Sequence, residues 1–144
     1  MKVSLIKGGK FADHRGVLHF VNEANPGQYQ RFYLITHSDI NVIRAWQGHK
    51  IEEKAFYAIL GGFIIAVVRP ASMENPTYNE IPEFFRLTKE NNEFLRVPAG
   101  YYTGIKALLP NSTLLVLSSL DFAGSKADDY RQPFDKWVQW DAVE

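Results

Sequence analysis

The sequence of 144 residues contains no cysteine, which excludes disulfides, thiolate metal sites and cysteine nucleophiles. Its net charge is zero, with 16 basic and 16 acidic residues, so the composition argues against a nucleic-acid or anionic-membrane surface. No apolar run reaches the length that spans a bilayer, and the opening MKVSLIKGGK lacks the apolar core of a signal peptide. The chain also lacks the GxGxxG, Walker and GxSxG motifs. We therefore expect a cytoplasmic protein that binds neither nucleic acid nor membrane.

What the chain does contain is typical of a globular all-β protein. Hydrophobic residues make up 46% of the sequence and aromatic residues 14%, and short β-rich runs alternate with turn residues. The candidate strands are residues 3–6, 16–21, 30–36, 41–46, 54–69, 83–88, 93–98, 102–109 and 112–120. Many short strands at even spacing predict a sandwich or barrel, and we expect one domain covering residues 1–144.

Two local features refine this prediction. The Gly61–Gly62 pair inside the run 54–69 is suited to a two-residue hairpin turn. The segment 128–140, DDYRQPFDKWVQW, is suited to a short helix or an extended arm. Its two tryptophans should then pack back on the body of the protein.

The stretch RAWQGHKIEEKAFYAILGG, from Arg44 to Gly62, places titratable residues directly before an apolar strand. In an extended chain, alternation puts Gln47 and His49 on one face and Arg44 and Trp46 on the other, unless a bulge intervenes. An inward Gln and His are costly to bury unless something bonds them, and a ligand would do so. His49 is then the best general acid or base, because its ordinary pKa lies near neutrality.

Other interpretations of this stretch remain open. Arg44, Lys50 and Lys54 could hold phosphates or stabilise an oxyanion, but they could also belong to a solvated surface hairpin. Gln47, His49 and Glu53 have the approximate spacing of a barrel metal-binding box. The second such box would need a histidine where the sequence has Thr103, so the ligand set is poor and we expect no metal.

The remaining histidines are weaker candidates for a functional role. His19 alternates with valines and could face inward, where a hydrogen-bonded core histidine is the usual case. His37 lies in a turn signal, and His14 is expected to be exposed.

The order of seven motifs resembles a known family. They are DHRGVLHFVNE, RFYLI, VIRAWQGHK, EKAFYAILGG, NPTYNEIPEFFRLTKENNEFLRVPAGYYTG, LLVLSSLDF and DDYR. In this order, over residues 13–137, the sequence resembles the cupin-type, RmlC-like nucleotide-sugar isomerases and epimerases. These are the dTDP-4-keto-6-deoxyglucose 3,4-ketoisomerases, with their WxcM-like relatives, and the dTDP-4-keto-6-deoxyhexose 3,5-epimerases. The resemblance implies a jelly-roll barrel, a homodimer with an exchanged N-terminal strand, a nucleotide-sugar substrate and no cofactor.

The resemblance also implies a chemistry. A 4-keto group acidifies the neighbouring C–H, a base removes that proton, and an enediolate forms that is reprotonated elsewhere. Gln47 and His49 fall on the two histidines of the family motif, and Lys54 falls on the active-site lysine of the epimerases. These three are the predicted catalytic residues. The predicted substrate-binding residues are Arg15, Arg31, Tyr33, Arg44, Trp46, Lys50, Tyr102 and Asp121.

The sequence departs from the family pattern at three positions. Gln47 cannot act as a base, Thr103 replaces a histidine of the epimerases, and Phe122 stands where a tyrosine acid is common. Ketoisomerisation would then run on His49, with Tyr102 or Asp121 as the acid. The alternatives are a non-catalytic cupin that binds a sugar nucleotide and, third, a metal-dependent cupin.

Overall fold

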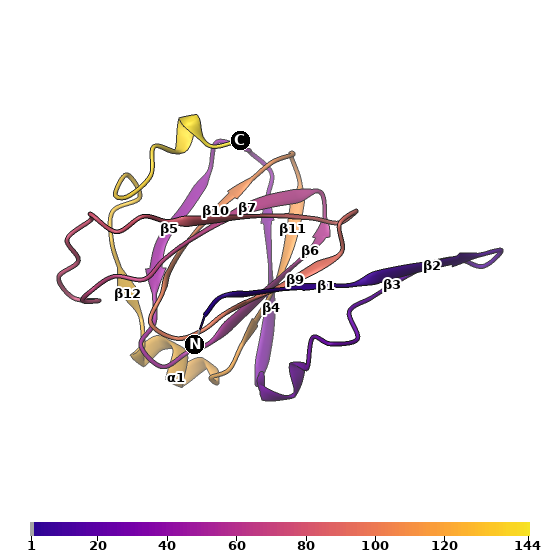
Figure 1. Ribbon diagram of the computed structural model, residues 1–144, viewed down its shortest axis with the longest axis horizontal. Helices are drawn as coiled ribbons and strands as arrows, with labels where there is room; N and C mark the ends of the chain where they lie inside the picture. The colour runs from indigo at the N-terminus through magenta and orange to yellow at the C-terminus, as the bar shows by residue number, and fades with distance from the viewer. Residues whose placement is uncertain (1) are drawn as a thin grey trace.

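The computed structural model describes residues 2–144, whose strands form two five-stranded antiparallel sheets and a projecting two-stranded hairpin (Figure 1). The first sheet has the order β1 (Ser4–Lys7), β9 (Glu93–Val97), β6 (Lys54–Leu60), β11 (Ser112–Ser118) and β4 (Arg31–His37). The second has the order β12 (Tyr130–Arg131), β5 (Ile43–Gly48), β10 (Tyr102–Ala107), β7 (Gly62–Val68) and β8 (Glu83–Thr88). The hairpin consists of β2 (Gly9–Asp13) and β3 (Gly16–Phe20). The all-β prediction is confirmed.

The turn between β6 and β7 lies at the predicted glycine pair. Gly61 has a φ of 68°, a conformation that glycine adopts without strain, and a Cβ there would collide with Ser112. The hydroxyl of Ser112 accepts a hydrogen bond from the backbone N–H of Gly62 at 3.0 Å. The turn therefore lies where it was predicted, with Ser112 from β11 holding it in place, but the hairpin prediction was wrong, because β6 and β7 do not pair and the turn carries the chain from the first sheet to the second.

The core has two parts because β7 is buried on both faces. Its inward residues, Phe63, Ile65 and Val67, belong to a cluster inside the barrel. Its outward residues, Ala66 and Val68, belong to a second cluster beneath the C-terminal segment. The inner cluster fills one half of the barrel with aliphatic and aromatic side chains, and the other half is left for the cavity described below.

The C-terminal segment packs on the outer face of the second sheet as an arm. The ring centroids of Trp137 and Trp140 lie 5.2 and 5.6 Å from that of Trp46, so both tryptophans pack back on the body as predicted. Trp140 begins the short 3₁₀ turn η2 (Trp140–Ala142), and Lys106 Nζ donates to the carbonyls of Trp140 and Val143 at 2.8 and 2.7 Å.

Two further elements complete the chain. The 3₁₀ turn η1 (Pro26–Gln28) precedes β4, and the helix α1 (Phe122–Ala127) follows β11. The sequence interpretation contained no helix at 122–127. The β2–β3 hairpin extends away from the barrel (Figure 1) and exposes the side chains of Phe11, Val17 and Leu18. Within residues 2–144, no helix is long and apolar enough to cross a membrane.

Candidate active site

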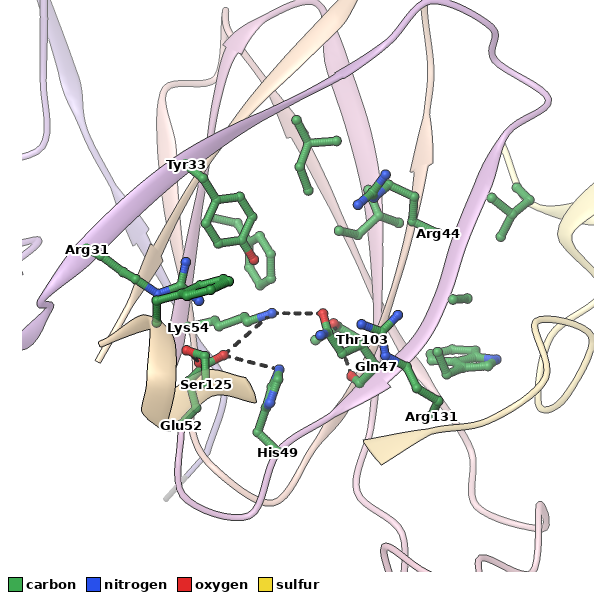
Figure 2. A pocket seen from close by; sticks show the side chains of 17 residues that line it. Arg31, Tyr33, Arg44, Gln47, His49, Glu52, Lys54, Thr103, Ser125 and Arg131 are labelled. Atoms are coloured by element: carbon green, nitrogen blue, oxygen red, sulfur yellow. Dashed lines mark hydrogen bonds and ion pairs between the residues drawn. The ribbon is translucent and has the colours of Figure 1, made fainter. Parts of the chain in front are cut away.

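A cavity of about 680 Å³ lies between the two sheets, beside α1. Arg31 and Tyr33 of β4 form one wall, and Arg44 and Arg131 of the other sheet lie opposite them (Figure 2). Gln47, His49, Glu52, Lys54, Thr103, Phe122 and Ser125 also line it. All of these residues except Phe122 are polar, and they gather in the half of the barrel that the inner core cluster leaves empty.

A bulge in β5 decides which of its side chains face the cavity. Gln47 pairs with Thr103 of β10 and Ala45 pairs with Gly104, so Trp46 is the extra residue. Arg44 and Gln47 therefore both line the cavity, because the bulge that the sequence prediction named as its exception is present and the simple alternation does not hold. Trp46 also borders the cavity, but its ring packs in the C-terminal cluster, where its Nε1 donates to the carbonyl of Lys136 at 2.8 Å.

His49 is held in one orientation just after β5. Its side chain is buried, and Nδ1 lies 2.6 Å from the backbone carbonyl oxygen of Asp128. Because a carbonyl oxygen can only accept, this contact assigns a proton to Nδ1. In the neutral ring, Nε2 then carries a free electron pair. Figure 2 shows the Nε2 side of the ring turned toward the cavity, beside Glu52 and Lys54.

Glu52 is 1% exposed and lies next to this nitrogen. The hydroxyl of Ser125 in α1 donates to Glu52 Oε1. Glu52 Oε2 lies 3.2 Å from His49 Nε2 and 3.5 Å from Lys54 Nζ. Neither Oε2 nor Nε2 has a partner with hydrogen-bond geometry in the described part of the chain.

The loop that carries Glu52 is fixed from a distant part of the sequence. The carboxylate of Asp128 accepts the backbone N–H groups of Lys50, Ile51 and Glu52, each at 2.8 Å. Asp128 therefore positions both the ring of His49, through its carbonyl, and the backbone of Glu52, through its side chain.

Lys54 and Gln47 form a second link across the cavity floor. Lys54, the first residue of β6, donates from Nζ to Gln47 Oε1 at 3.0 Å. Gln47 Nε2 donates in turn to Asp129 Oδ1 at 3.2 Å. The amide of Gln47 is thus oriented from both ends, with its oxygen toward the lysine.

The electrostatics keep His49 neutral at neutral pH. Burial lowers the pKa of His49 below its ordinary 6.5, and the nearby Lys54 cation lowers it further. The hydrogen bond to Asp128 and the charges of Glu52 and Asp128 act in the opposite direction. A neutral imidazole with a free Nε2 electron pair is the form that can accept a proton.

The cavity favours an anionic ligand. Its lining contains four cationic side chains, Arg31, Arg44, Lys54 and Arg131, and a single carboxylate, Glu52. Arginines offer several N–H donors in a planar fork that suits phosphate oxygens. The guanidinium of Arg31 also lies 5.2 Å from the centroid of the Tyr33 ring, which places both on the β4 wall.

The structure does not bring four of the predicted residues into the cavity. Arg15 lies at the hairpin tip and pairs with Asp13 at 2.6 Å, and exposed Lys50 pairs with Glu74. Buried Tyr102 donates its hydroxyl to the carbonyl of Met73 at 2.6 Å. Asp121 caps α1 by accepting the N–H of Gly124 at 2.8 Å. In these positions Tyr102 and Asp121 do not face His49.

The sequence interpretation missed Glu52, Ser125 and Arg131. It considered Glu53 instead, whose carboxylate turns away from the cavity and bonds Tyr29, Gln28 and Arg96. The signal for Glu52 was its spacing of three residues from His49, which brings both side chains together where the chain turns between β5 and β6. Among residues 2–144, no group of three or more His, Cys, Asp or Glu side chains is placed to hold a metal ion.

The two antiparallel sheets enclosing this cavity form a cupin jelly roll, and comparison with solved structures identifies proteins that share the fold. The QdtA 3,4-ketoisomerase from Thermoanaerobacterium thermosaccharolyticum, in complex with TDP, is 22% identical with a TM-score of 0.72, covering 91% of this chain and 88% of that one. A dTDP sugar isomerase from Desulfovibrio desulfuricans is 16% identical with a TM-score of 0.77, covering 99% and 92%. The dTDP-4-dehydrorhamnose 3,5-epimerase from Bacillus anthracis, with TDP and PPi bound, is 16% identical with a TM-score of 0.75, covering 92% and 79%.

These similarities confirm the jelly-roll fold that the sequence resemblance implied. No protein-family model matches the sequence, and no curated protein matches it. The function of this chain therefore has to be argued from its own cavity.

Proposed function

We propose that this protein is an isomerase or epimerase that acts on a dTDP-linked 4-keto-6-deoxy sugar, as in deoxysugar synthesis for surface polysaccharides. The observation that carries the proposal is the buried His49 at the floor of a cavity with four cationic side chains. Solved proteins of the same fold are named as acting on such sugars, and some hold TDP or TDP-4-keto-6-deoxyglucose. A base beside a cationic anion site matches the needs of a keto sugar carried on a diphosphate.

In the proposed reaction, His49 Nε2 takes the proton from the carbon next to the ketone. The C–H bond breaks, its electron pair passes into the enediolate, and an N–H bond forms. Lys54 Nζ, with the amide of Gln47 beside it, stabilises the enediolate oxygen. In a ketoisomerase the carbon proton returns to C4 while the hydroxyl proton moves from O3 to O4. In an epimerase it returns to the same carbon from the opposite face. Neither course requires a cofactor.

The arginines supply the affinity for the nucleotide part. Arg31 on one wall and Arg44 and Arg131 on the other can reach a diphosphate from both sides (Figure 2). Tyr33 lies beside Arg31 on the first wall, where its ring can pack on a base or sugar.

Proton NMR of dTDP-4-keto-6-deoxyglucose with the protein in deuterated water tests this proposal. We expect deuterium to enter at C3 or C5. The matched control is dTDP-glucose, which lacks the ketone and should bind without exchange. If neither nucleotide sugar binds, the proposal fails.

A second candidate is a sugar-nucleotide-binding cupin without catalysis. The observation that favours it is Gln47, which occupies the position of the usual base and is tied to Lys54 and Asp129. It predicts line broadening of the ketone sugar, which reports binding, with no deuterium incorporation. Detectable exchange beside the ketone would exclude it.

The same proposal includes a homodimer and a cytoplasmic location, the latter fitting the cysteine-free sequence. The β2–β3 hairpin and the outer face of β4 expose apolar side chains, namely Phe11, Val17, Leu18, Phe32 and Leu34. A second copy that covers these side chains would remove a large apolar surface from water. Sedimentation equilibrium that finds a monomer at micromolar concentration would exclude the dimer.

A further inference from the structure

We propose that Glu52 is the positioning residue for His49, and that the two side chains accept the substrate proton as a pair. The inference rests on the proposed function, since it assigns the proton to a group next to the sugar. The His49–Glu52 pair also takes the place of the acids expected from the sequence, Tyr102 and Asp121, whose side chains lie outside the cavity.

The geometry of the pair carries the proposal. Nδ1 of His49 is engaged by the carbonyl of Asp128, so a proton arriving from the cavity can bind only at Nε2. Glu52 Oε2 lies 3.2 Å from that nitrogen, close enough to accept a charge-assisted hydrogen bond once Nε2 is protonated. In the neutral state two electron pairs face each other. A hydrogen bond between His49 and Glu52 therefore forms only when one proton lies between Nε2 and Oε2.

A purely structural carboxylate would look different. Glu53, the next residue, is bonded by Arg96 at 3.0 Å and by the Tyr29 hydroxyl at 2.6 Å, so its charge is compensated by ordinary partners. Glu52 is more deeply buried, yet in the described chain Oε2 accepts no hydrogen bond, and its nearest cation is the Lys54 ammonium at 3.5 Å. Burying a carboxylate oxygen this way costs stability, and such costs are concentrated at functional sites.

The surrounding elements hold Glu52 through Oε1 and its backbone N–H, without a hydrogen bond to Oε2. Ser125 of α1 donates to Oε1, and the Asp128 carboxylate fixes the backbone N–H of Glu52. The charged groups facing His49 are Glu52 and Asp128, which favour its protonated form, and Lys54, which opposes it. Asp129 lies further out, bonded to Gln47 and Arg131.

The directions in which these charges shift the pKa of His49 give a test that does not depend on turnover. Long-range proton–nitrogen NMR on the full chain with ¹⁵N-labelled histidine follows the pKa of His49, with His49→Gln to assign its signals. Because the charge of Glu52 raises the pKa of His49, Glu52→Gln should lower it by about one unit or more. Lys54→Met should shift it in the opposite direction. Glu74→Gln removes an exposed carboxylate that pairs with Lys50 and should leave it unchanged.

Kinetics then separate positioning from binding. Glu52→Gln should lower kcat by about a hundredfold with little change in KM, because Glu52 makes no contact with the arginine walls. The acidic limb of the kcat/KM profile should move to lower pH in Glu52→Gln and to higher pH in Lys54→Met. A merely structural glutamate would not move this limb.

The outcomes are distinguishable. An unchanged or raised pKa of His49 in Glu52→Gln overturns the pair, whatever the substrate. A lowered pKa in a protein that exchanges no deuterium supports the pair and overturns the proposed isomerisation. Should Glu52→Gln fail to fold, carbon NMR of the wild-type Glu52 carboxyl decides instead. Its signal should respond at the same pH midpoint as the ring of His49, and independent midpoints would contradict the pair.

Discussion

Two histidines occupy the two halves of the barrel interior. His49 is 5% exposed in the polar half, with the Asp128 carbonyl on one ring nitrogen and Glu52 beside the other. His37, the last residue of β4, is 3% exposed in the apolar half and packs edge-on against Phe63 at 5.6 Å. Neither ring nitrogen of His37 has a hydrogen-bond partner among residues 2–144.

The difference shows what burial alone can and cannot do. Burial lowers the pKa of both histidines, with the Lys54 charge adding to the effect at His49 and the Arg44 charge at His37. Both rings are therefore neutral at neutral pH. At His49 the carboxylate of Glu52 can stabilise the protonated ring, whereas a proton on His37 would meet apolar side chains and the positive charge of Arg44. The two histidines therefore differ in the neighbours of a buried imidazole and not in its burial.

The largest expected effect comes from making the same substitution in both halves. His49→Gln should lower turnover of the keto sugar by about a thousandfold while TDP still binds, because it removes the base and leaves the arginines. His37→Gln should keep its turnover, since the side chain lies in the filled half. Turnover by NMR and TDP affinity by calorimetry would be measured on both variants. A folded His37→Gln protein that loses turnover equally would break the comparison.

The free energy of unfolding should be more sensitive to substitutions in the apolar, filled half than in the polar half. Leu114 is fully buried in the filled half, so Leu114→Ala should cost about 2–5 kcal/mol through lost contacts and a residual cavity. Thr103 lines the existing cavity, and its hydroxyl makes one weak contact, 3.5 Å from the carbonyl of Gln47. Thr103→Ala should therefore cost less than about 1 kcal/mol. Urea denaturation of both variants measures this, and equal losses would show that the two halves are not packed differently.

The filled half could be predicted from the sequence far better than the polar half. Strand residues, the position of the Gly61–Gly62 turn and the all-β class follow from alternation and turn chemistry, which act between neighbours in the chain. That β6 and β7 enter different sheets does not follow from them. The bulge at Trp46 could not be predicted this way, because the extra residue is defined by the register against β10. That single residue brings Arg44 onto the wall of the cavity.

Glu52 illustrates the same limit at the site. Glu52 and Glu53 are adjacent and chemically identical, so the spacing of Glu52 three residues after His49 is a weak signal in the sequence alone. The structure separates them through contacts from residues far along the chain, since Ser125 and Asp128 hold Glu52 whereas Arg96 holds Glu53. His37 was assigned to a turn, but it still pairs with Ser112 in β11, and the turn begins one residue later.

The smallest expected effect concerns the pH dependence of stability. In the unfolded chain His37 takes up a proton near its ordinary pKa of 6.5, whereas burial lowers its pKa in the folded state. Its contribution to stability is therefore complete above pH about 6.5 and is lost as the pH falls toward the folded pKa. His37→Leu removes this loss and two unpartnered nitrogens, so the free energy of unfolding should rise by about 1 kcal/mol, more at acid than at neutral pH. Because His49 has the same sign, some decline should remain in the variant. Denaturation at several pH values measures both slopes, and a decline as steep as in the wild type would mean that His37 is solvated after all.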